Sequence, residues 1–143
     1  DSLRLEAGLP LYGQDLDTNT TPIEAGLGWT IPRRRQAEGG YPGAAILTRE
    51  LAAGPARRRV GLRLEGAAPA RAGAEIMEED GSAAGRVTSG LFSPTLGVPI
   101  AMGYVRADLA IPGTRLLLSV RGRALPARVV PLPFVAHRYH RPA

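Results

Sequence analysis

Glu6 is the first residue whose type and surroundings could do chemistry, because it lies in the short apolar stretch LRLEAG at residues 3–8. The two oxygens of a carboxylate can accept a pair of neighbouring N–H donors, and a charged acceptor makes each bond stronger. The alternative is a solvated helix carboxylate paired with a neighbouring arginine. On these residues alone, the alternative is favoured.

A run of three arginines at positions 33–35 is the second candidate for binding chemistry. The planar guanidinium presents a fork of N–H donors that matches a carboxylate or a carbonyl group. The alternative is a solvated basic loop, and we expect one or two of the three arginines to belong to it.

Asp15, Asp17 and Asn19 imitate the opening of a calcium-binding loop. The pattern then fails, because Thr20 stands where the loop needs glycine and Gly26 stands where it needs a bidentate glutamate. We therefore expect no metal site here and interpret the segment as a turn-rich loop.

Several reaction types are excluded by residues that the sequence lacks. It has no cysteine, which removes disulfides, thiol nucleophiles and zinc–thiolate sites and is compatible with a reducing compartment. All 18 basic residues are arginine, so neither a Schiff-base lysine nor a P-loop lysine is available. No GxSxG or GxGxxG motif occurs, and His137 and His140 have no ligand cluster, so we interpret them as surface residues.

Short helices and turns must position these candidates in the first part of the chain. A helix is expected at the start, where Leu3 and Ala7 share a face, Asp1 or Ser2 can cap the first turn, and Gly8 suits the end. Because so short a helix is marginal alone in water, packing must hold it.

Two further signals follow before residue 54. Thr21, with Pro22 after it and Glu24 three residues on, predicts a capping box at the start of a turn. Residues 42–53 predict a helix that Gly54 and Pro55 end.

From about Arg57 onward the apolar period changes to two, which is typical of strands with one buried face. The Asp80-Gly81 pair and Gly122 predict hairpin turns. Short alternating strands separated by Gly and Pro indicate an antiparallel barrel or sandwich. The alternating apolar residues are Val60, Leu62 and Leu64, then Leu116, Leu118 and Val120, then Leu125, Ala127 and Val129.

The order of several motifs resembles the C-terminal portion of the aminomethyltransferase of the glycine cleavage system, the tetrahydrofolate-dependent T-protein. The resemblance covers the whole chain, and the arginine run followed by Tyr-Pro-Gly is most similar to the mitochondrial-type and related bacterial branch. The motifs are DSLRLEAGLPLYG (1–13), DLD (15–17), TTPIEAGLGW (20–29), RRR (33–35), YPGA (41–44), VTSG (87–90), SPTLG (93–97), AMGYV (101–105) and LPFV (132–135).

The resemblance implies an α+β fragment of a folate-binding domain followed by an all-β antiparallel barrel. Residues 1–53 would be the C-terminal part of the tetrahydrofolate-binding domain, whose remainder would lie upstream, and residues 57–143 would form the C-terminal β-barrel domain. The family's principal catalytic residue is an aspartate of the N-terminal half and has no counterpart here. We therefore expect this chain alone to hold part of a folate site, no catalytic residue and no activity.

The resemblance also assigns three cofactor-binding candidates. Glu6 matches the family's pterin-binding glutamate, which would accept the adjacent N–H and amino group of a reduced pterin. Arg35 matches a folate-contacting arginine, with Arg34 left open because the register within the run is insecure. Tyr139 matches a ligand-contacting tyrosine, although the tail around it, AHRYH at residues 136–140, departs from the relatives.

For function, the resemblance implies transfer of a one-carbon unit from the aminomethyl-lipoyl arm of the H-protein to tetrahydrofolate, with release of ammonia. The protein would supply mainly orientation and electrostatics, because the folate nitrogens make the bonds. The location would be the mitochondrial matrix in a eukaryote and the cytoplasm in a bacterium. The alternatives are the folate domain of a dimethylglycine or sarcosine dehydrogenase, which the arginine run before Tyr-Pro-Gly disfavours, and a non-catalytic folate-binding or protein-interaction module.

The net charge of +5 suits an acidic ligand or partner, and both the glutamate tail of folate and an acidic H-protein fit it. The aromatic content of 5% is poor for stacking on bases, which argues against a nucleic-acid-binding barrel. No apolar run reaches the roughly 20 residues that span a membrane. We therefore expect neither nucleic acid nor a membrane as a partner.

Overall fold

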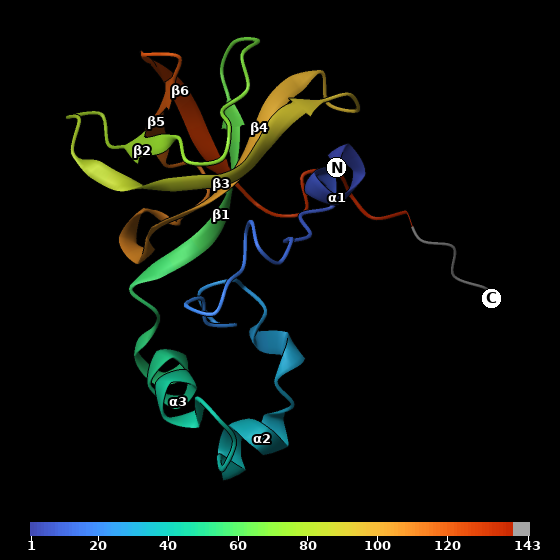
Figure 1. Cartoon of the computed structure of the whole chain (residues 1–143), viewed down its shortest axis with the longest axis vertical. Helices are drawn as coiled ribbons and strands as arrows, with labels where there is room; N and C mark the ends of the chain where they lie inside the picture. Colours follow the sequence, from blue (N-terminus) through green and yellow to red (C-terminus); the bar gives the residue numbers. More distant parts are fainter. Residues whose placement is uncertain (139–143) are drawn as a thin grey trace.

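The computed structural model describes residues 1–138, in which short helices lead into a closed barrel of antiparallel strands (Figure 1). The strand order is β1-β4-β3-β2-β5-β6, and β6 pairs with β1 to close the barrel. This confirms the predicted antiparallel barrel and rejects the sandwich. The strands are β1 (Arg57–Leu64), β2 (Glu75–Met77), β3 (Ala83–Ser93), β4 (Val98–Arg106), β5 (Arg115–Val120) and β6 (Arg123–Val130). The helices are α1 (Ser2–Glu6), α2 (Arg33–Glu38) and α3 (Ala44–Ala53), with 3-10 turns at Gly28–Thr30 and Ala107–Leu109.

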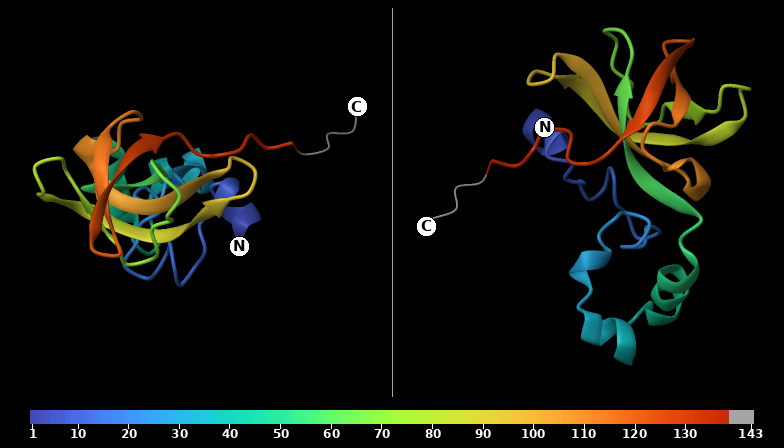
Figure 2. Two further views of the ribbon diagram at one scale, coloured as in Figure 1. Left: turned by 90° about the horizontal axis from the view of Figure 1, so that it is seen from above. Right: turned by 180° about the vertical axis from the view of Figure 1, so that it is seen from behind.

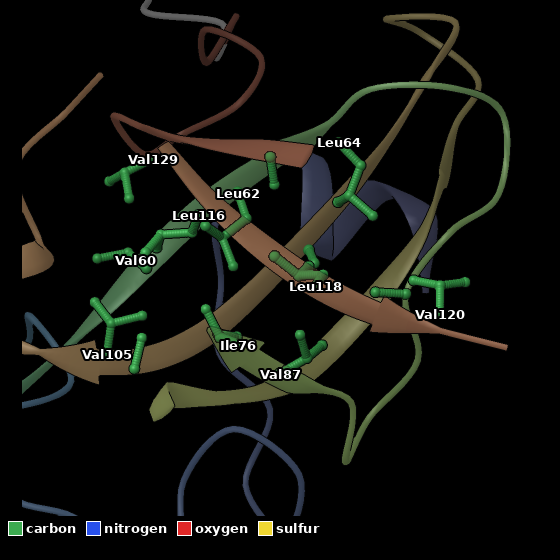
Figure 3. Close-up of a cluster of buried hydrophobic side chains, with 14 residues drawn as sticks. Val60, Leu62, Leu64, Ile76, Val87, Val105, Leu116, Leu118, Val120 and Val129 are labelled. Carbon is green, nitrogen blue, oxygen red and sulfur yellow. The ribbon is translucent and has the colours of Figure 1, made fainter. Parts of the chain in front are cut away.

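The barrel interior is filled by the alternating apolar side chains, which converge from opposite strands (Figure 3). Along β1, Leu62 is fully buried while its neighbour Arg63 is exposed, as the period of two predicts. Burying one such side chain contributes about 1.5–3 kcal/mol, so this interior is the main source of stability. The principal interior residues are Val60, Leu62, Leu64, Ile76, Val87, Val105, Leu116, Leu118, Val120, Ala127 and Val129.

Two hairpins join neighbouring strands where the turn residues predicted them. Gly81 has φ +86° in the connection between β2 and β3. At the β5–β6 turn, Val120 pairs with Arg123, and the two residues between them, Arg121 and Gly122, have φ values of +51° and +75°. Positive φ at both central residues is the mark of a type I′ turn, whose twist matches that of the strands.

Residues 1–53 contain turns and short helices, and Figures 1 and 2 show α2 and α3 at the end of the molecule away from the barrel. The helix predicted over 42–53 is confirmed as α3, which begins after Gly43 (φ +80°) and ends before Gly54 (φ +81°). The capping box is also confirmed. The Glu24 N–H donates to the Thr21 hydroxyl at 3.1 Å, and the Thr21 N–H donates to the Glu24 carboxylate at 3.2 Å.

Helix α1 packs through a different face from the one that Leu3 and Ala7 share. Leu3 is 80% exposed, whereas Leu5 is 1% exposed. The side chain of Asp1 makes no capping bond and instead pairs with Arg4 at 2.6 Å. Tertiary contacts, and not the local pattern of the helix, therefore set its orientation.

Candidate functional site

Glu6, the last residue of α1, is buried against the turn that leaves β3. Its Oε1 atom accepts hydrogen bonds from the Ser93 hydroxyl and from the Thr95 N–H at 3.0 Å, and Oε2 accepts one from the Thr95 hydroxyl at 2.8 Å. Glu6 is only 4% exposed. The interpretation of Glu6 as a solvated carboxylate paired with an arginine is therefore wrong.

The hydrogen bonds around Glu6 favour its charged form. The bond from Ser93 is the largest cause that holds the pKa of Glu6 below its ordinary value of 4.5. Burial acts in the opposite direction, and the two bonds from Thr95 lower the pKa further. Glu6 is therefore an ionised acceptor at neutral pH, although its partners are neutral groups.

The barrel and the segment after β6 together hold α1 in place. Leu5 packs on the outer face of β4, in a cluster with Ile100, Met102, Leu132 and Phe134. The Val135 N–H donates to the backbone carbonyl of Glu6 at 3.0 Å. Gly8 has φ +69°, and a Cβ there would lie 3.2 Å from Leu132, so only glycine suits this close approach.

The bonds to Glu6 are divided unevenly between its two oxygens. A carboxylate has about four acceptor positions. Among the described residues, Ser93 and Thr95 fill two positions on Oε1 and one on Oε2. Oε2 therefore accepts one bond fewer than Oε1.

The arginine run forms the first turns of α2, and all three side chains are exposed. Arg34 pairs with Glu38 one helical turn away, with 3.6 Å between Nε and Oε2. Within the described part of the chain, neither Arg33 nor Arg35 has a carboxylate partner. The guanidinium of Arg35 is thus available for an anion, while that of Arg34 is partly engaged.

The structure does not bring the three predicted site residues together. Helix α1, which carries Glu6, lies beside the barrel, whereas α2, which carries Arg35, lies beside α3 at the opposite end (Figures 1 and 2). Tyr139 lies outside the described residues. The assignment of these residues to one folate site stays a prediction.

Asp15 is a buried polar centre that sequence reasoning placed in an ordinary turn. Its carboxylate accepts bonds from Arg4 Nη1 at 2.7 Å, Thr88 Oγ1 at 2.5 Å, Ser89 Oγ at 2.6 Å and the Leu11 N–H at 2.9 Å. These partners tie the N-terminal segment to β3. No local spacing could have shown this, because Ser89 lies 74 residues away along the chain.

Tyr104 and Arg57 continue this polar region along the barrel wall. The Tyr104 hydroxyl donates to the Asp15 carbonyl at 2.9 Å, and burial raises the pKa of Tyr104 to about 12. The Arg57 guanidinium lies 4.8 Å from the centre of the Tyr104 ring and pairs with Glu24 at 3.1 Å. A cavity of about 110 Å³ lies beside these groups, but its polar groups are bonded to one another, which indicates a structural role.

Residues 1–138 hold neither a metal-binding cluster nor a membrane-spanning helix. No three His, Cys, Asp or Glu side chains within this range are grouped so that they could hold a metal ion. Over the same range, no helix has both the length and the apolar character needed to cross a membrane.

The fold and the helix attached to it define a class of protein: a closed antiparallel barrel with a short helix fastened to its wall through a buried glutamate. Residues 57–136, more than half of the chain, match the family described as the Glycine cleavage T-protein C-terminal barrel domain. The chain belongs to this family.

Particular relatives extend the similarity over the whole chain. It is 52% identical over 143 residues to "Aminomethyltransferase, mitochondrial" of Flaveria trinervia and 51% identical over 140 residues to the protein of the same name from Gallus gallus. These matches cover 100% and 98% of this chain but 35% and 36% of the relatives. The structure of glycine cleavage system aminomethyltransferase T from Bartonella henselae matches with a TM-score of 0.93 and 42% identity, over 99% of this chain and 39% of that one. The chain thus spans about 35% of the length of the curated relatives.

Proposed function

We propose that this chain is part of a tetrahydrofolate-dependent aminomethyltransferase of the glycine cleavage system. The reaction passes the one-carbon unit of the aminomethyl-lipoyl H-protein to tetrahydrofolate and releases ammonia. The names of the relatives support the transferase class. At the residue level, the proposal depends on one observation: the buried Glu6 carboxylate is held by three donors from the turn after β3.

Glu6 would bind the pterin end of tetrahydrofolate. The adjacent N–H and amino group of the reduced pterin would donate to the carboxylate, and the negative charge would make these bonds stronger than bonds between neutral groups. Bound tetrahydrofolate supplies the nitrogen that receives the one-carbon unit. Glu6 would orient the ring, which is the contribution that the residues of this chain can make to the rate.

Arg35 would bind an anionic or carbonyl group of the same ligand. It is exposed on α2 and has no carboxylate partner among residues 1–138. Since α1 and α2 lie apart, Glu6 and Arg35 would contact different parts of an extended molecule (Figure 1). Tyr139 remains a third proposed contact.

Residues 1–53 would be the C-terminal part of the folate-binding domain, and residues 57–143 would be the barrel domain. The distribution of exposed large apolar side chains supports this division. Most of them lie in the first segment, where a larger domain would cover them. They are Leu3, Leu9, Leu11, Tyr12, Trp29, Ile46 and Leu51.

The lipoylated H-protein would be the macromolecular partner, and we propose no binding of nucleic acid or membranes. The net charge of +5 supports an acidic partner. The relatives of Flaveria trinervia and Gallus gallus are named as mitochondrial, which supports the mitochondrial matrix as the location in a eukaryote. In a bacterium the location would be the cytoplasm.

A second candidate function is a non-catalytic module in which Glu6 only fastens α1 to the barrel. One observation favours it, because all the donors on Glu6 come from this chain itself. The two roles of Glu6 make different predictions. If Glu6 only attaches α1 to the barrel, folate affinity does not depend on its charge, whereas it does if Glu6 contacts the ligand.

An aminomethyl-transfer assay with the full-length gene product tests the proposed function. Lipoylated H-protein charged with an aminomethyl group, tetrahydrofolate and enzyme are combined, and ammonia release and the one-carbon folate product are measured. We expect both products only when all three components are present. Folate binding without transfer would favour the non-catalytic module, and the absence of both would contradict the proposal.

A further inference from the structure

Ser93 and Thr95 form a rigid support for the Glu6 carboxylate. Ser93 is the last residue of β3 and is fully buried, and its hydroxyl both donates to Glu6 and accepts the Leu96 N–H at 3.1 Å. The Gly97 N–H donates to the Ser93 carbonyl at 2.9 Å and closes the turn. The support is thus organised by bonds of its own, in addition to those it makes with Glu6.

Pro94 lies between the two supporting residues and contributes to this rigidity. Proline fixes its own φ and has no N–H. The first backbone donor after Ser93 is therefore that of Thr95, which bonds to Glu6. Thr95 is also the residue that touches both carboxylate oxygens, through its N–H and its hydroxyl.

We propose that Ser93 and Thr95 are positioning residues that hold the Glu6 carboxylate in the orientation in which it binds the pterin. They donate two bonds to Oε1 and one to Oε2, so the orientation of the carboxylate is set before a ligand binds. This inference rests on the proposed function, and it adds that the turn after β3 sets the orientation of the Glu6 carboxylate.

The same residues keep Glu6 an acceptor. A buried carboxylate without donors binds a proton more readily and would then donate instead of accept. No charged side chain among residues 1–138 bonds to the Glu6 carboxylate. On α1, Arg4 pairs with Asp1, the residue before the helix, and with Asp15. From the segment after β6, His137 contacts the Ala7 carbonyl. The hydroxyl and amide donors of the turn are therefore the groups that keep the Glu6 carboxylate ionised.

Three variants of the full-length gene product test the inference by equilibrium binding of tetrahydrofolate. Ser93→Ala and Thr95→Val each remove one hydroxyl donor to Glu6 and should weaken binding about tenfold, because the ligand must then order the carboxylate itself. Thr95→Ser keeps both donors and should bind like the parent. Ile76→Val, in the separate cluster inside the barrel, is the control for a loss of stability without a change at Glu6.

The pH dependence of binding separates positioning from a general loss of structure. Binding should fail as Glu6 becomes protonated, and the Ser93 bond is the main cause that keeps its pKa low. In Ser93→Ala, the fall in affinity should therefore begin at a higher pH than in the parent. Ile76→Val should leave the pH of this fall unchanged.

The outcomes separate the inference from the function on which it rests. If the parent does not bind tetrahydrofolate, the proposed function itself is contradicted. The function stands if the parent binds tetrahydrofolate and Glu6→Gln weakens this binding. The positioning role is nevertheless overturned if Ser93→Ala and Thr95→Val have the same affinity and the same pH dependence of binding as Ile76→Val. The positioning role is supported if Ser93→Ala and Thr95→Val bind tetrahydrofolate weakly while Thr95→Ser binds it like the parent.

Discussion

At the scale of single residues, Glu6 is a charge that burial alone would destabilise. Removing a carboxylate from water is unfavourable unless donors replace the lost hydration. The hydroxyls of Ser93 and Thr95 and one backbone N–H replace it, and they do so from a single turn. The same arrangement that makes the charge tolerable also fixes its direction, which is what a ligand contact needs.

The lowered pKa of Glu6 predicts how stability depends on pH. A carboxylate whose pKa is depressed on folding contributes stability above its ordinary value, here 4.5, and this contribution disappears as the pH falls through the folded-state value. Glu6→Gln should thus lower the free energy of unfolding by about 1–3 kcal/mol at neutral pH. In urea unfolding, the difference from the parent should narrow in acid. A difference independent of pH would show that Glu6 is not stabilised as an anion.

Alanine substitutions in the arginine run should weaken tetrahydrofolate binding to different extents. Arg35→Ala should weaken tetrahydrofolate binding by about tenfold, and Arg33→Ala should have a smaller effect, because only one member of the run is expected to contact the ligand. Arg34→Ala should also have a small effect, since Arg34 already pairs with Glu38. Titration of the three variants checks the order. A larger loss in Arg33→Ala or Arg34→Ala would move the contact within the run.

The identity of Glu6 as a candidate could be predicted from sequence, but its environment could not. The motif around it supports the resemblance, and the helix end at Gly8 follows from local rules. Its donors, however, lie 87 and 89 residues away, and so a carboxylate with an arginine close by in the sequence looked like a solvated surface group. Asp15 was misjudged for the same reason.

At the scale of elements, α1 is held by packing on the barrel wall and not by its own propensity. Its length of five residues is far below what is stable alone in water. The anchor is Leu5, which packs with Ile100 and Met102 on the outer face of β4. The helix and the barrel should therefore respond together when this anchor is removed.

A pair of leucine variants tests this anchor. Leu5→Ala should cost about 2–5 kcal/mol of stability, as expected for a buried leucine. Leu3→Ala makes the same chemical change on the same helix at a side chain that is 80% exposed, and should cost within about 0.5 kcal/mol. Thermal unfolding of both measures the difference. Equal losses would contradict the packing of α1 described here.

The strands were more predictable than the helices. In the barrel, the alternation of apolar residues records which face is buried, so Val60, Leu62 and Leu64 indicated both the strand and its interior face. In α1, five residues carry too little periodicity to indicate which face is buried. Leu3 was expected on the packed face of the helix but is exposed. Barrel closure followed only from the pairing of β1 with both β4 and β6, which strand patterns do not contain.

At the scale of the whole molecule, the barrel and residues 1–53 differ in how much apolar surface they bury. The closed barrel contains most of the core, whereas residues 1–53 leave Trp29 and Tyr12 largely exposed. Regions with few buried contacts open at low free-energy cost. We therefore expect limited trypsin digestion of the 143-residue chain to cut first at Arg33–Arg35 on α2, with mass spectrometry identifying the site. First cleavage within β1, β4 or β6 would contradict this difference.

In the proposed function, the barrel holds Glu6 as a charged acceptor for tetrahydrofolate. The most direct measurement is equilibrium binding of tetrahydrofolate to the full-length gene product and to its Glu6→Gln variant at neutral pH. The variant keeps the size of the side chain and loses its charge, so we predict binding weakened about tenfold or more while the fold is retained in circular dichroism. Equal affinity in a folded variant would contradict the claim and leave Glu6 as a structural tie between α1 and the barrel.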